Sequence, residues 1–431
     1  MKTYINPPIQ DWENLAQRKT FSGKDLNETV KTIFDDVQKN GTAAVQKYTQ
    51  LFDGVIIENT AINDAEIENA IATVSEELKK AIQIAAANIK KFHQSQKEIP
   101  NKIETTAGVF CWRESRAIET VGIYIPGGTA PLFSTVLMLA IPAKIAGCKN
   151  IILCSPPDKN GNINPAILYA AQLTGITKMY KVGGIQAIAS MTFGTSDIPK
   201  VSKIFGPGNQ YVTAAKQYAQ QLGLAIDMPA GPSELLVLVD ETCNPAFVAS
   251  DLLSQAEHGA DSQVILVATS EEIVLKVADA IEIQKNELPR QSIAEKALEN
   301  SRALVFENLK TAIDFSNFYA PEHLIFAVDD AEDKLQLIEN AGSVFIGNYS
   351  CESAGDYASG TNHTLPTNGF AKNYSGVSVD SFVKKVTFQK ITAIGIQNLG
   401  PTIEIMAEAE NLIAHKNAVS IRLKNLRNEQ Y

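Results

Sequence analysis

The sequence predicts an α/β protein with two Rossmann-like domains, each incomplete and doubly wound, a short N-terminal arm and a small C-terminal α/β unit. With 431 residues, 45% of them hydrophobic, the chain is too long for one ordinary core. Short apolar runs alternate with helix-like segments in two successive blocks, which is typical of βαβ folds. Glycine-rich turns follow several of these runs. Both blocks therefore favour parallel sheets.

The N-terminal quarter predicts an arm followed by helices. Residues 1–23 contain two prolines and a tryptophan without a sustained period. Further along, apolar residues recur at spacings of three and four from residue 67 to residue 92, the pattern of an amphipathic helix. His93 borders this stripe among lysines. We expect His93 to be a solvated surface residue.

The first alternating block predicts four strands. They are residues 121–125, 151–154, 179–182 and 203–205. Glycine-rich turns follow three of them, where open α/β sheets bind ligands and where helix starts expose N–H groups to a pyrophosphate. The usual dinucleotide and nucleoside-triphosphate fingerprints are absent. From the turns alone, tight packing connections are favoured over a cofactor loop.

The second block predicts further strands and a terminal unit. The strands are residues 235–239, 263–267 and 343–346, followed by a strand over 382–391 and a helix through Met406 and Ala418. We expect one Rossmann-like domain from residues 24–123 plus 234–375 and the other from 124–233. Residues 376–431 would form the terminal unit.

Composition excludes several function classes. The net charge is −10, from 38 basic and 48 acidic residues, and no basic run is interleaved with aromatics, so nucleic acid is not expected as a partner. No apolar stretch of about eighteen residues could span a bilayer, and the first residues lack a signal-peptide run. The expected compartment is the cytoplasm. The five cysteines include no Cys-x-x-Cys pair, which favours free thiols.

Histidines give the strongest functional signal. Only five occur, and four follow residue 257 beside acidic or amide side chains. The pairings are Gln255/Glu257 with His258, Glu322 with His323, Asp356 with His363 and Glu410 with His415. Imidazole and carboxylate groups bind divalent metals and transfer protons near neutral pH. The pattern therefore indicates a metal site with acid/base chemistry.

Two of these pairs have predicted positions. A helix over residues 247–258, capped by Gly259, would place Gln255 and His258 on one side within reach of one ion; the alternative is a polar helix end. Glu322 and His323 follow a proline and precede a buried strand. We expect both in the turn, converging on a substrate, although an ordinary surface pair would show the same pattern.

The other two pairs lie later in the chain. Residues 352–366 predict a glycine-rich polar loop in which Asp356 offers an oxygen ligand and His363 either contacts substrate or stabilises the loop. His415 lies on the last helical segment, more than fifty residues after Asp356. Such a segment reaches a neighbouring subunit's site more easily than its own, which favours a shared site.

Several motifs, taken in order, resemble the histidinol dehydrogenase family along nearly the whole chain. They are Tyr124-Ile-Pro-Gly-Gly128, Gly183-Gly-Ile-Gln186, Phe205-Gly-Pro-Gly-Asn209, Ala230-Gly-Pro-Ser233-Glu234, Ser254-Gln-Ala-Glu-His258, Ala320-Pro-Glu-His323, Gly355-Asp356 through Pro366, and Ala414-His-Lys-Asn-Ala418. The resemblance implies a homodimer, one Zn²⁺ per subunit, NAD, and oxidation of L-histidinol through the aldehyde to L-histidine, the last steps of histidine biosynthesis.

The resemblance also implies roles for single residues. Zn²⁺ would bind Gln255, His258, Asp356 and, from the other subunit, His415. NAD would contact Tyr124, Gln186 and Asn209. Substrate would contact Ser233, His363 and Glu410 besides the zinc ligands and the catalytic pair. His323 would accept the alcohol proton, and Glu322 would activate water for the second oxidation.

Three rival functions stay open on the sequence. A dehydrogenase for another small alcohol would keep the zinc and NAD residues and change the pocket. A zinc hydrolase would use Glu322 to activate water and bind no nucleotide. A zinc ion that only joins two subunits would leave Glu322 and His323 without a role.

Overall fold

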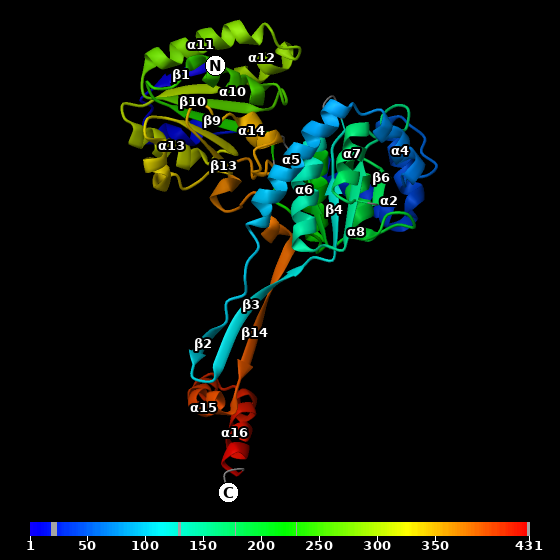
Figure 1. Cartoon of the computed structure of the whole chain (residues 1–431), viewed down its shortest axis with the longest axis vertical. Helices are drawn as coiled ribbons and strands as arrows, with labels where there is room; N and C mark the ends of the chain where they lie inside the picture. Colours follow the sequence, from blue (N-terminus) through cyan, green and yellow to red (C-terminus); the bar gives the residue numbers. More distant parts are fainter. Residues whose placement is uncertain (19–23, 128–130, 177, 230, 429–431) are drawn as a thin grey trace. The chain divides into compact units, whose positions relative to one another are not determined.

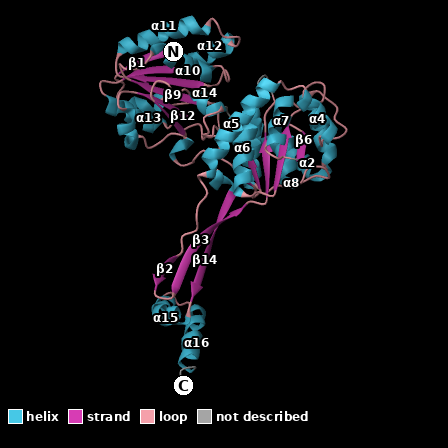
Figure 2. Ribbon diagram, in the orientation of Figure 1, coloured by secondary structure: helices cyan, strands magenta, loops and turns pink. Residues whose placement is uncertain are grey.

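The computed structural model describes residues 1–18, 24–127, 131–176, 178–229 and 231–428. Gly128 and Ala230, which belong to two of the motifs, lie outside these residues. The chain divides into two compact units, residues 1–96 with 118–382, and residues 97–117 with those from 383 onward. Figure 1 shows the elements in sequence colours, and Figure 2 separates helices from strands.

The larger unit contains a five-stranded parallel sheet in the order β6-β5-β4-β7-β8. Its strands are β4 (Thr120–Tyr124), β5 (Asn150–Ser155), β6 (Lys178–Lys181), β7 (Lys203–Phe205) and β8 (Ala225–Ile226). Val121 and Ile123 enter one hydrophobic cluster and Tyr124 the other, because successive strand residues point to opposite faces. Helices cover both faces. The four predicted strands are confirmed to within one residue at each end.

Among the described residues, eight helices surround this sheet, some of them through another helix. They are α2 (Lys24–Asn40), α3 (Thr42–Asp53), α4 (Asp64–Ala72), α5 (Glu76–Gln94), α6 (Phe133–Ala146), α7 (Pro165–Leu173), α8 (Gly184–Phe193) and α9 (Gln210–Gln221). We grouped the first four with residues 234–375, yet α2 packs on α8, α4 on α7 and α5 on α6. The apolar stripe of α5, with Ile82 and Ile89, joins the cluster of Val121. Periodicity shows that a helix face is buried, not which sheet buries it.

His93 is fully buried, so the prediction of a solvated residue was wrong. The apolar stripe of α5 continues from Ile82 and Ile89 one turn further, and the imidazole occupies its last position. His93 Nδ1 lies 2.8 Å from the Ile89 carbonyl oxygen, and Nε2 lies 3.3 Å from Asn362 Nδ2. Desolvation lowers the pKa of His93. The neighbouring lysines, which suggested exposure, lie on the other side of the helix.

A six-stranded parallel sheet with the order β1-β11-β10-β9-β12-β13 also belongs to the larger unit. Its strands are β1 (Lys2–Ile5), β9 (Glu234–Val239), β10 (Gln263–Ala268), β11 (Arg302–Val305), β12 (His323–Ala327) and β13 (Ser343–Ile346). Leu235 and Val237 face one cluster, Leu236 and Leu238 the other. The three predicted strands of this block are confirmed, and the opening segment, expected as an arm, supplies the edge strand β1.

Helices and short turns surround this second sheet. They are α1 (Trp12–Leu15), α10 (Pro245–Ala256), α11 (Glu271–Lys285), α12 (Gln291–Glu299), α13 (Leu309–Tyr319), α14 (Glu352–Tyr357) and the 3₁₀ helices η1 (Ile9–Asp11), η2 (Ala331–Leu337) and η3 (Phe370–Lys372). The 3₁₀ helix η4 (Val379–Phe382) packs instead on α6, beside the five-stranded sheet. Trp12 packs edge-on against Phe315, with ring centroids 5.3 Å apart. This contact holds the N-terminal segment on its own sheet.

The smaller unit is an antiparallel sheet in the order β14-β3-β2 with two helices. Its elements are β2 (Ile103–Thr106), β3 (Val109–Ala117), β14 (Val383–Ile391), α15 (Ala393–Ala409) and α16 (Ile413–Asn428). The predicted strand is confirmed, and β3 pairs along its length, so residues 97–117 belong here as well. The single predicted helix is two helices, separated where Asn411 has a left-handed φ of 59°.

Among the described residues, no helix is both long and apolar enough to cross a membrane.

Candidate functional site

The candidate site starts at the amino ends of two neighbouring strands. Glu234 opens β9 and His323 opens β12, and these strands pair in parallel. Glu322 immediately precedes His323, and its Oε2 accepts a hydrogen bond from the Glu234 backbone N–H at 2.8 Å. His323 Nδ1 lies 3.3 Å from the Glu234 carbonyl oxygen. The pairing of the two strands thus brings a carboxylate and an imidazole to one point.

The placement of Glu322 and His323, the predicted catalytic pair, differs from the prediction in one respect. Glu322 lies in the turn as expected, but His323 is already the first residue of the strand, where it pairs with Ser343 of β13. The Ser343 N–H donates to the Glu322 carbonyl oxygen at 2.9 Å, so the ladder begins one residue earlier than the sequence indicated. Both side chains are buried, with 7% and 4% of the residue surface exposed. The alternative of an ordinary surface pair is therefore excluded.

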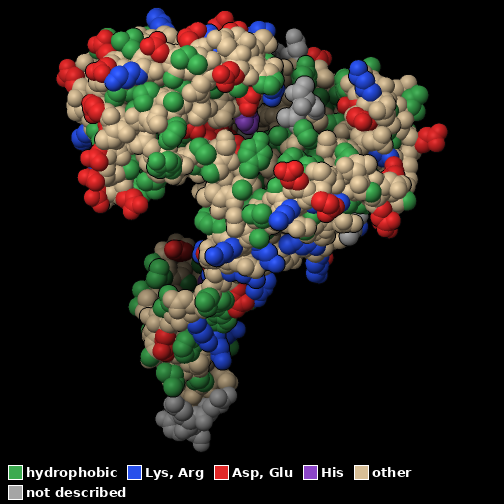
Figure 3. All heavy atoms as spheres, turned by 45° about the horizontal axis from the view of Figure 1, so that its top comes forward, with side chains coloured by type: hydrophobic (Ala, Val, Ile, Leu, Met, Phe, Trp, Pro, Cys, Tyr) green, Lys and Arg blue, Asp and Glu red, His purple; other side chains and the backbone are tan. Residues whose placement is uncertain are grey.

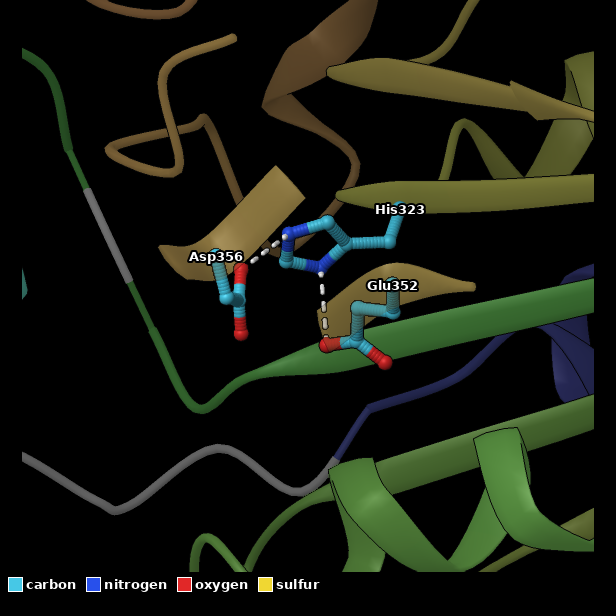
Figure 4. Close-up of side chains that lie close together, drawn as sticks. All are labelled: His323, Glu352 and Asp356. Carbon is cyan, nitrogen blue, oxygen red and sulfur yellow. Dashed lines mark ion pairs between the residues drawn. The ribbon is translucent and has the colours of Figure 1, made fainter. Parts of the chain in front are cut away.

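Two carboxylates of α14 face the His323 ring. His323 Nδ1 lies 3.6 Å from Glu352 Oε1, and Nε2 lies 3.6 Å from Asp356 Oδ1 (Figure 4). Glu352 and Asp356 are four residues apart on a helix, which places them on one face. One ligand atom from each of the three residues lies within 4.8 Å of the others. This geometry suits a divalent cation.

Gln255 reaches the same carboxylates from the last turn of α10. In the amide orientation that satisfies its neighbours, the Gln255 nitrogen donates to Glu352 Oε1 and its oxygen lies 2.9 Å from the Glu234 backbone nitrogen, whose N–H it shares with Glu322 Oε2. The helix ends at Ala256 with Glu257 as its cap, not at Gly259 as predicted. His258 therefore follows the helix, and its N–H bonds to the Gln255 carbonyl oxygen at 3.3 Å. Desolvation lowers the pKa of His258.

His363 is held by two hydrogen bonds. Its Nδ1 lies 2.9 Å from the Asp356 carbonyl oxygen and its Nε2 lies 3.1 Å from Thr135 Oγ1 on α6. The preceding residue, Asn362, donates to the Met138 carbonyl oxygen at 2.6 Å and contacts buried His93. The loop-stabilising role considered for His363 is thus present. His363 is also beside the cluster, with Nδ1 3.9 Å from Asp356 Oδ1.

Burial controls the protonation of the cluster. Desolvation raises the pKa values of Glu322 and Glu352 well above the usual range and that of Asp356 to about 7. It lowers the pKa of His323 to about 3 and that of His363 to about 4. The imidazoles are therefore neutral near pH 7, as metal binding and proton acceptance require. A bound cation would stabilise the ionised carboxylates.

One buried nitrogen of this cluster has no hydrogen-bond partner among the described residues. It is Nε2 of His323, the atom that faces Asp356. Buried polar atoms are nearly always paired, so an unpaired one marks a position where a ligand or substrate atom belongs. In the space-filling view, histidine atoms (purple) emerge at only a small patch of the face shown (Figure 3).

A second cavity lies at the carboxyl ends of the five-stranded sheet. It measures about 640 Å³ and includes Tyr124, Gln186 and Asn209 in its lining. Tyr124 ends β4, and its hydroxyl accepts a hydrogen bond from the Gly184 N–H at 3.0 Å. Gln186 lies in the first turn of α8, fully buried, and both of its amide atoms lack a partner among the described residues. The cavity thus presents unpaired polar groups at a helix start, which suits an anionic ligand.

Asn209 begins α9 on the same edge. Its Oδ1 accepts hydrogen bonds from the N–H groups of Tyr211 and Val212, at 3.0 and 3.2 Å. The preceding turn is tied down, because the Gly206 N–H donates to Asp227 at 2.8 Å and Lys216 Nζ donates to the Gly206 carbonyl oxygen at 2.8 Å. The predicted glycine turns therefore do follow the strand ends.

The remaining predicted residues lie outside this cluster or next to it. Ser233 immediately precedes Glu234, and its carbonyl oxygen accepts from the Gln263 N–H at 3.1 Å. Glu410 caps α15 and His415 lies in the first turn of α16, both exposed in the smaller unit. The structure of one chain groups Gln255, Glu322, His323, Asp356 and His363.

Comparison with known proteins decides the family. The family model described as histidinol dehydrogenase matches residues 16–423. The chain belongs to the histidinol dehydrogenase family. It is 54% identical to the histidinol dehydrogenase of Bacteroides thetaiotaomicron over 99% of this chain and all of the relative, and 50% identical to that of Aliivibrio fischeri over 99% and 97%. A crystal structure of histidinol dehydrogenase from Elizabethkingia anophelis superposes with a TM-score of 0.98 at 63% identity, over 99% of both chains.

As a member of the histidinol dehydrogenase family, the chain is an enzyme and an oxidoreductase. Sequence reasoning missed two carboxylates of its candidate site. The glycine-rich composition of residues 352–366 predicts a loop and gives Glu352 no role, although its spacing of four from Asp356 is that of neighbours on a helix. Glu234 is buried and pairs with Arg18, whose Nη2 lies 2.9 Å from Oε2. No local pattern links Arg18 to Glu234.

Proposed function

We propose that the chain oxidises L-histidinol twice with NAD, through the aldehyde to L-histidine, with Zn²⁺ in its site. These are the last steps of histidine biosynthesis. Family membership supports the substrate. The observation that carries the chemistry is the buried, neutral His323. Its Nε2 has no hydrogen-bond partner among the described residues and lies 3.6 Å from Asp356 Oδ1, and its Nδ1 lies 3.8 Å from Glu322 Oε2 and 3.6 Å from Glu352 Oε1. A site of this kind has an imidazole that can accept a proton, a carboxylate that can act as a second base, and ligands for a cation.

Zn²⁺ would be held by Gln255, His258 and Asp356, together with His415 contributed by a second copy of the chain. The donor types fit, because desolvation lowers the pKa of His258 and a cation would offset the cost of ionising the Asp356 carboxylate. Glu352 bonds to the Gln255 amide and would orient it. Bound zinc supplies a Lewis-acid centre that orients the amine and imidazole of the substrate.

NAD would occupy the cavity lined by Tyr124, Gln186 and Asn209 and accept hydride from the substrate. Both unpaired atoms of Gln186 support this proposal, since an amide can bond to a carboxamide, a ribose or a phosphate. The N–H groups at the start of α8 would face the pyrophosphate. This arrangement needs no Gly-x-Gly-x-x-Gly fingerprint.

His323 would act in the first oxidation and Glu322 in the second. His323, neutral near pH 7, would accept the alcohol proton while hydride leaves the carbon. Ionised Glu352 and Asp356, each 3.6 Å from the ring, would stabilise the resulting imidazolium. Glu322 would then take a proton from water that attacks the aldehyde. Its pKa, raised by burial, makes it a stronger base once ionised.

Ser233, His363 and Glu410 would contact the substrate, with Glu410 coming from the second copy, like His415. The smaller unit exposes several large apolar side chains, as green surface in Figure 3 illustrates. They include Ile394, Ile405, Met406 and Ile421, which are 61–69% exposed. Burial of such a surface against a second copy would be favourable. This supports a homodimer with shared sites.

The experiment that tests the function counts NADH formed per L-histidinol consumed by the zinc-loaded protein with excess NAD. A ratio of two supports both oxidations. A ratio of one indicates an alcohol dehydrogenase that stops at the aldehyde. No NADH would favour another alcohol or the hydrolase, and a panel of small alcohols and esters separates these. A Glu332→Gln variant, which alters an exposed carboxylate of η2, serves as the matched control.

A further inference from the structure

The cavity proposed for NAD contains a carboxylate that the proposed function does not use. Asp53 is the last residue of α3 and lines this cavity together with Tyr124 and Gln186. Its Oδ2 is buried and has no hydrogen-bond partner among the described residues. A buried, unpaired carboxylate oxygen costs free energy unless a ligand satisfies it.

Charge in this cavity favours neutral hydroxyl groups over a phosphate near Asp53. Among the described residues that line the cavity, none is lysine or arginine. Asp53 is the only acidic one, and its negative charge raises the pKa of nearby Tyr124, in addition to the effect of burial. A carboxylate accepts two hydrogen bonds from vicinal hydroxyls and repels a phosphate.

The position of Asp53 indicates which ribose it would meet. The catalytic cluster contacts α6 through the bond between His363 and Thr135, and α6 belongs to one face of the five-stranded sheet. Asp53 ends α3, which packs on α8 and belongs to the other face. A dinucleotide that delivers its nicotinamide to the cluster would therefore extend its adenosine half toward Asp53.

On this basis we propose that Asp53 accepts hydrogen bonds from the hydroxyls of the adenosine ribose and selects NAD over NADP. This inference rests on the proposed dinucleotide site and names the residue that would determine its preference for NAD over NADP. In the usual dinucleotide-binding folds, an acidic residue likewise binds the ribose hydroxyls. Here the acidic residue would come from a helix that precedes the sheet in the chain, not from a strand of it. Burial raises the pKa of Asp53 to about 6, so the group is ionised at pH 8.

The test measures binding of NADH and NADPH to the zinc-loaded protein without histidinol, by nicotinamide fluorescence at pH 8. The wild type should bind NADH at least about tenfold more tightly than NADPH, which corresponds to one charged interaction. Asp53→Asn should weaken NADH binding by about three- to tenfold and narrow the difference between the two nucleotides. Asp53→Ser should narrow the difference between NADH and NADPH further, because serine removes both the negative charge and the volume of the carboxylate.

Controls separate this inference from the proposed function. Asp35→Asn changes an exposed carboxylate of α2 outside the cavity lining and should leave both affinities unchanged. Equal wild-type binding of NADH and NADPH, or an unchanged ratio in both Asp53 variants, overturns the role of Asp53 and leaves NAD-linked oxidation intact. Failure of the wild type to bind either nucleotide overturns the proposed function itself. Unchanged zinc content and melting temperature show that each variant is folded.

Discussion

The backbone N–H of Glu234 donates a hydrogen bond to Oε2 of Glu322 at 2.8 Å. This bond joins the first residue of β9 to the residue before β12, and it orients the proposed base at the amino edge of the six-stranded sheet. The cavity proposed for NAD lies instead at the carboxyl edge of the five-stranded sheet, where open α/β sheets usually bind ligands. Under the proposed function, the base would therefore lie at the amino edge of one parallel sheet and NAD at the carboxyl edge of the other.

Glu322→Gln should reduce the yield from two NADH per histidinol to one. The amide oxygen can still accept the Glu234 N–H, so the fold is preserved, but the residue can no longer take a proton from water. The second oxidation should slow by about 10²- to 10⁴-fold, the usual contribution of one general base. Single-turnover absorbance with limiting histidinol checks this. A variant that still gives two NADH at the wild-type rate would remove Glu322 from the water-activating role.

The zinc ligands are tested by Glu352→Gln and Asp356→Asn. The resemblance assigns zinc to Gln255, His258, Asp356 and a second copy's His415, whereas the geometry of one chain groups His323, Glu352 and Asp356. Under the first arrangement, Glu352→Gln keeps its zinc and Asp356→Asn loses it. Zinc per subunit is measured by elemental analysis after dialysis. Loss of zinc from both variants would assign the ion to the second group.

Seven strands of the two sheets could be predicted from the sequence because each carries its signal locally, as a short apolar run. The short strands β1, β8 and β11 were not predicted. Contacts between residues far apart in the sequence have no such local signal. The three- and four-residue spacing in α5 predicts a buried helix face. It does not predict which sheet covers that face, or that His93 belongs to it. Glu352 was missed because glycines at 355 and 360 indicated a loop, yet one helical turn forms there. Asp53 likewise belongs to a cavity that only the packing of α3 on α8 creates.

Arg18→Met should destabilise the protein. Arg18 donates to both Glu234 oxygens, at 3.0 and 2.9 Å, and to the Tyr319 carbonyl oxygen at 2.7 Å. Removing it leaves a buried carboxylate without its cation, which costs about 3–5 kcal/mol. Urea unfolding measures the free energy difference. The double variant Arg18→Met/Glu234→Gln should recover part of it, since no charge is left unpaired, and a loss below about 1 kcal/mol in Arg18→Met would contradict this account.

Zinc affinity should rise with pH between about 6 and 8. Asp356 has a pKa raised to about 7 by burial, so in the metal-free protein its contribution to stability is present below the ordinary value of about 4 and is lost as pH rises through about 7. Zinc binds the ionised form and must displace the proton below that pH.

The pH effect has a defined size and source. Below about pH 7 the apparent zinc affinity should fall by up to about tenfold per pH unit for the one proton released by Asp356. His323 and His363, with pKa values lowered to about 3 and 4, stay neutral across this range and add no dependence. Chelator competition measures the affinity, and calorimetry in buffers of different ionisation enthalpy counts the protons. If Glu352→Gln retains zinc, it keeps the proton release of Asp356 and loses that of Glu352, whose pKa burial also raises. A flat affinity profile with no proton release would show that Asp356 is already ionised before zinc arrives, and that the positive charge stabilising it comes from the protein.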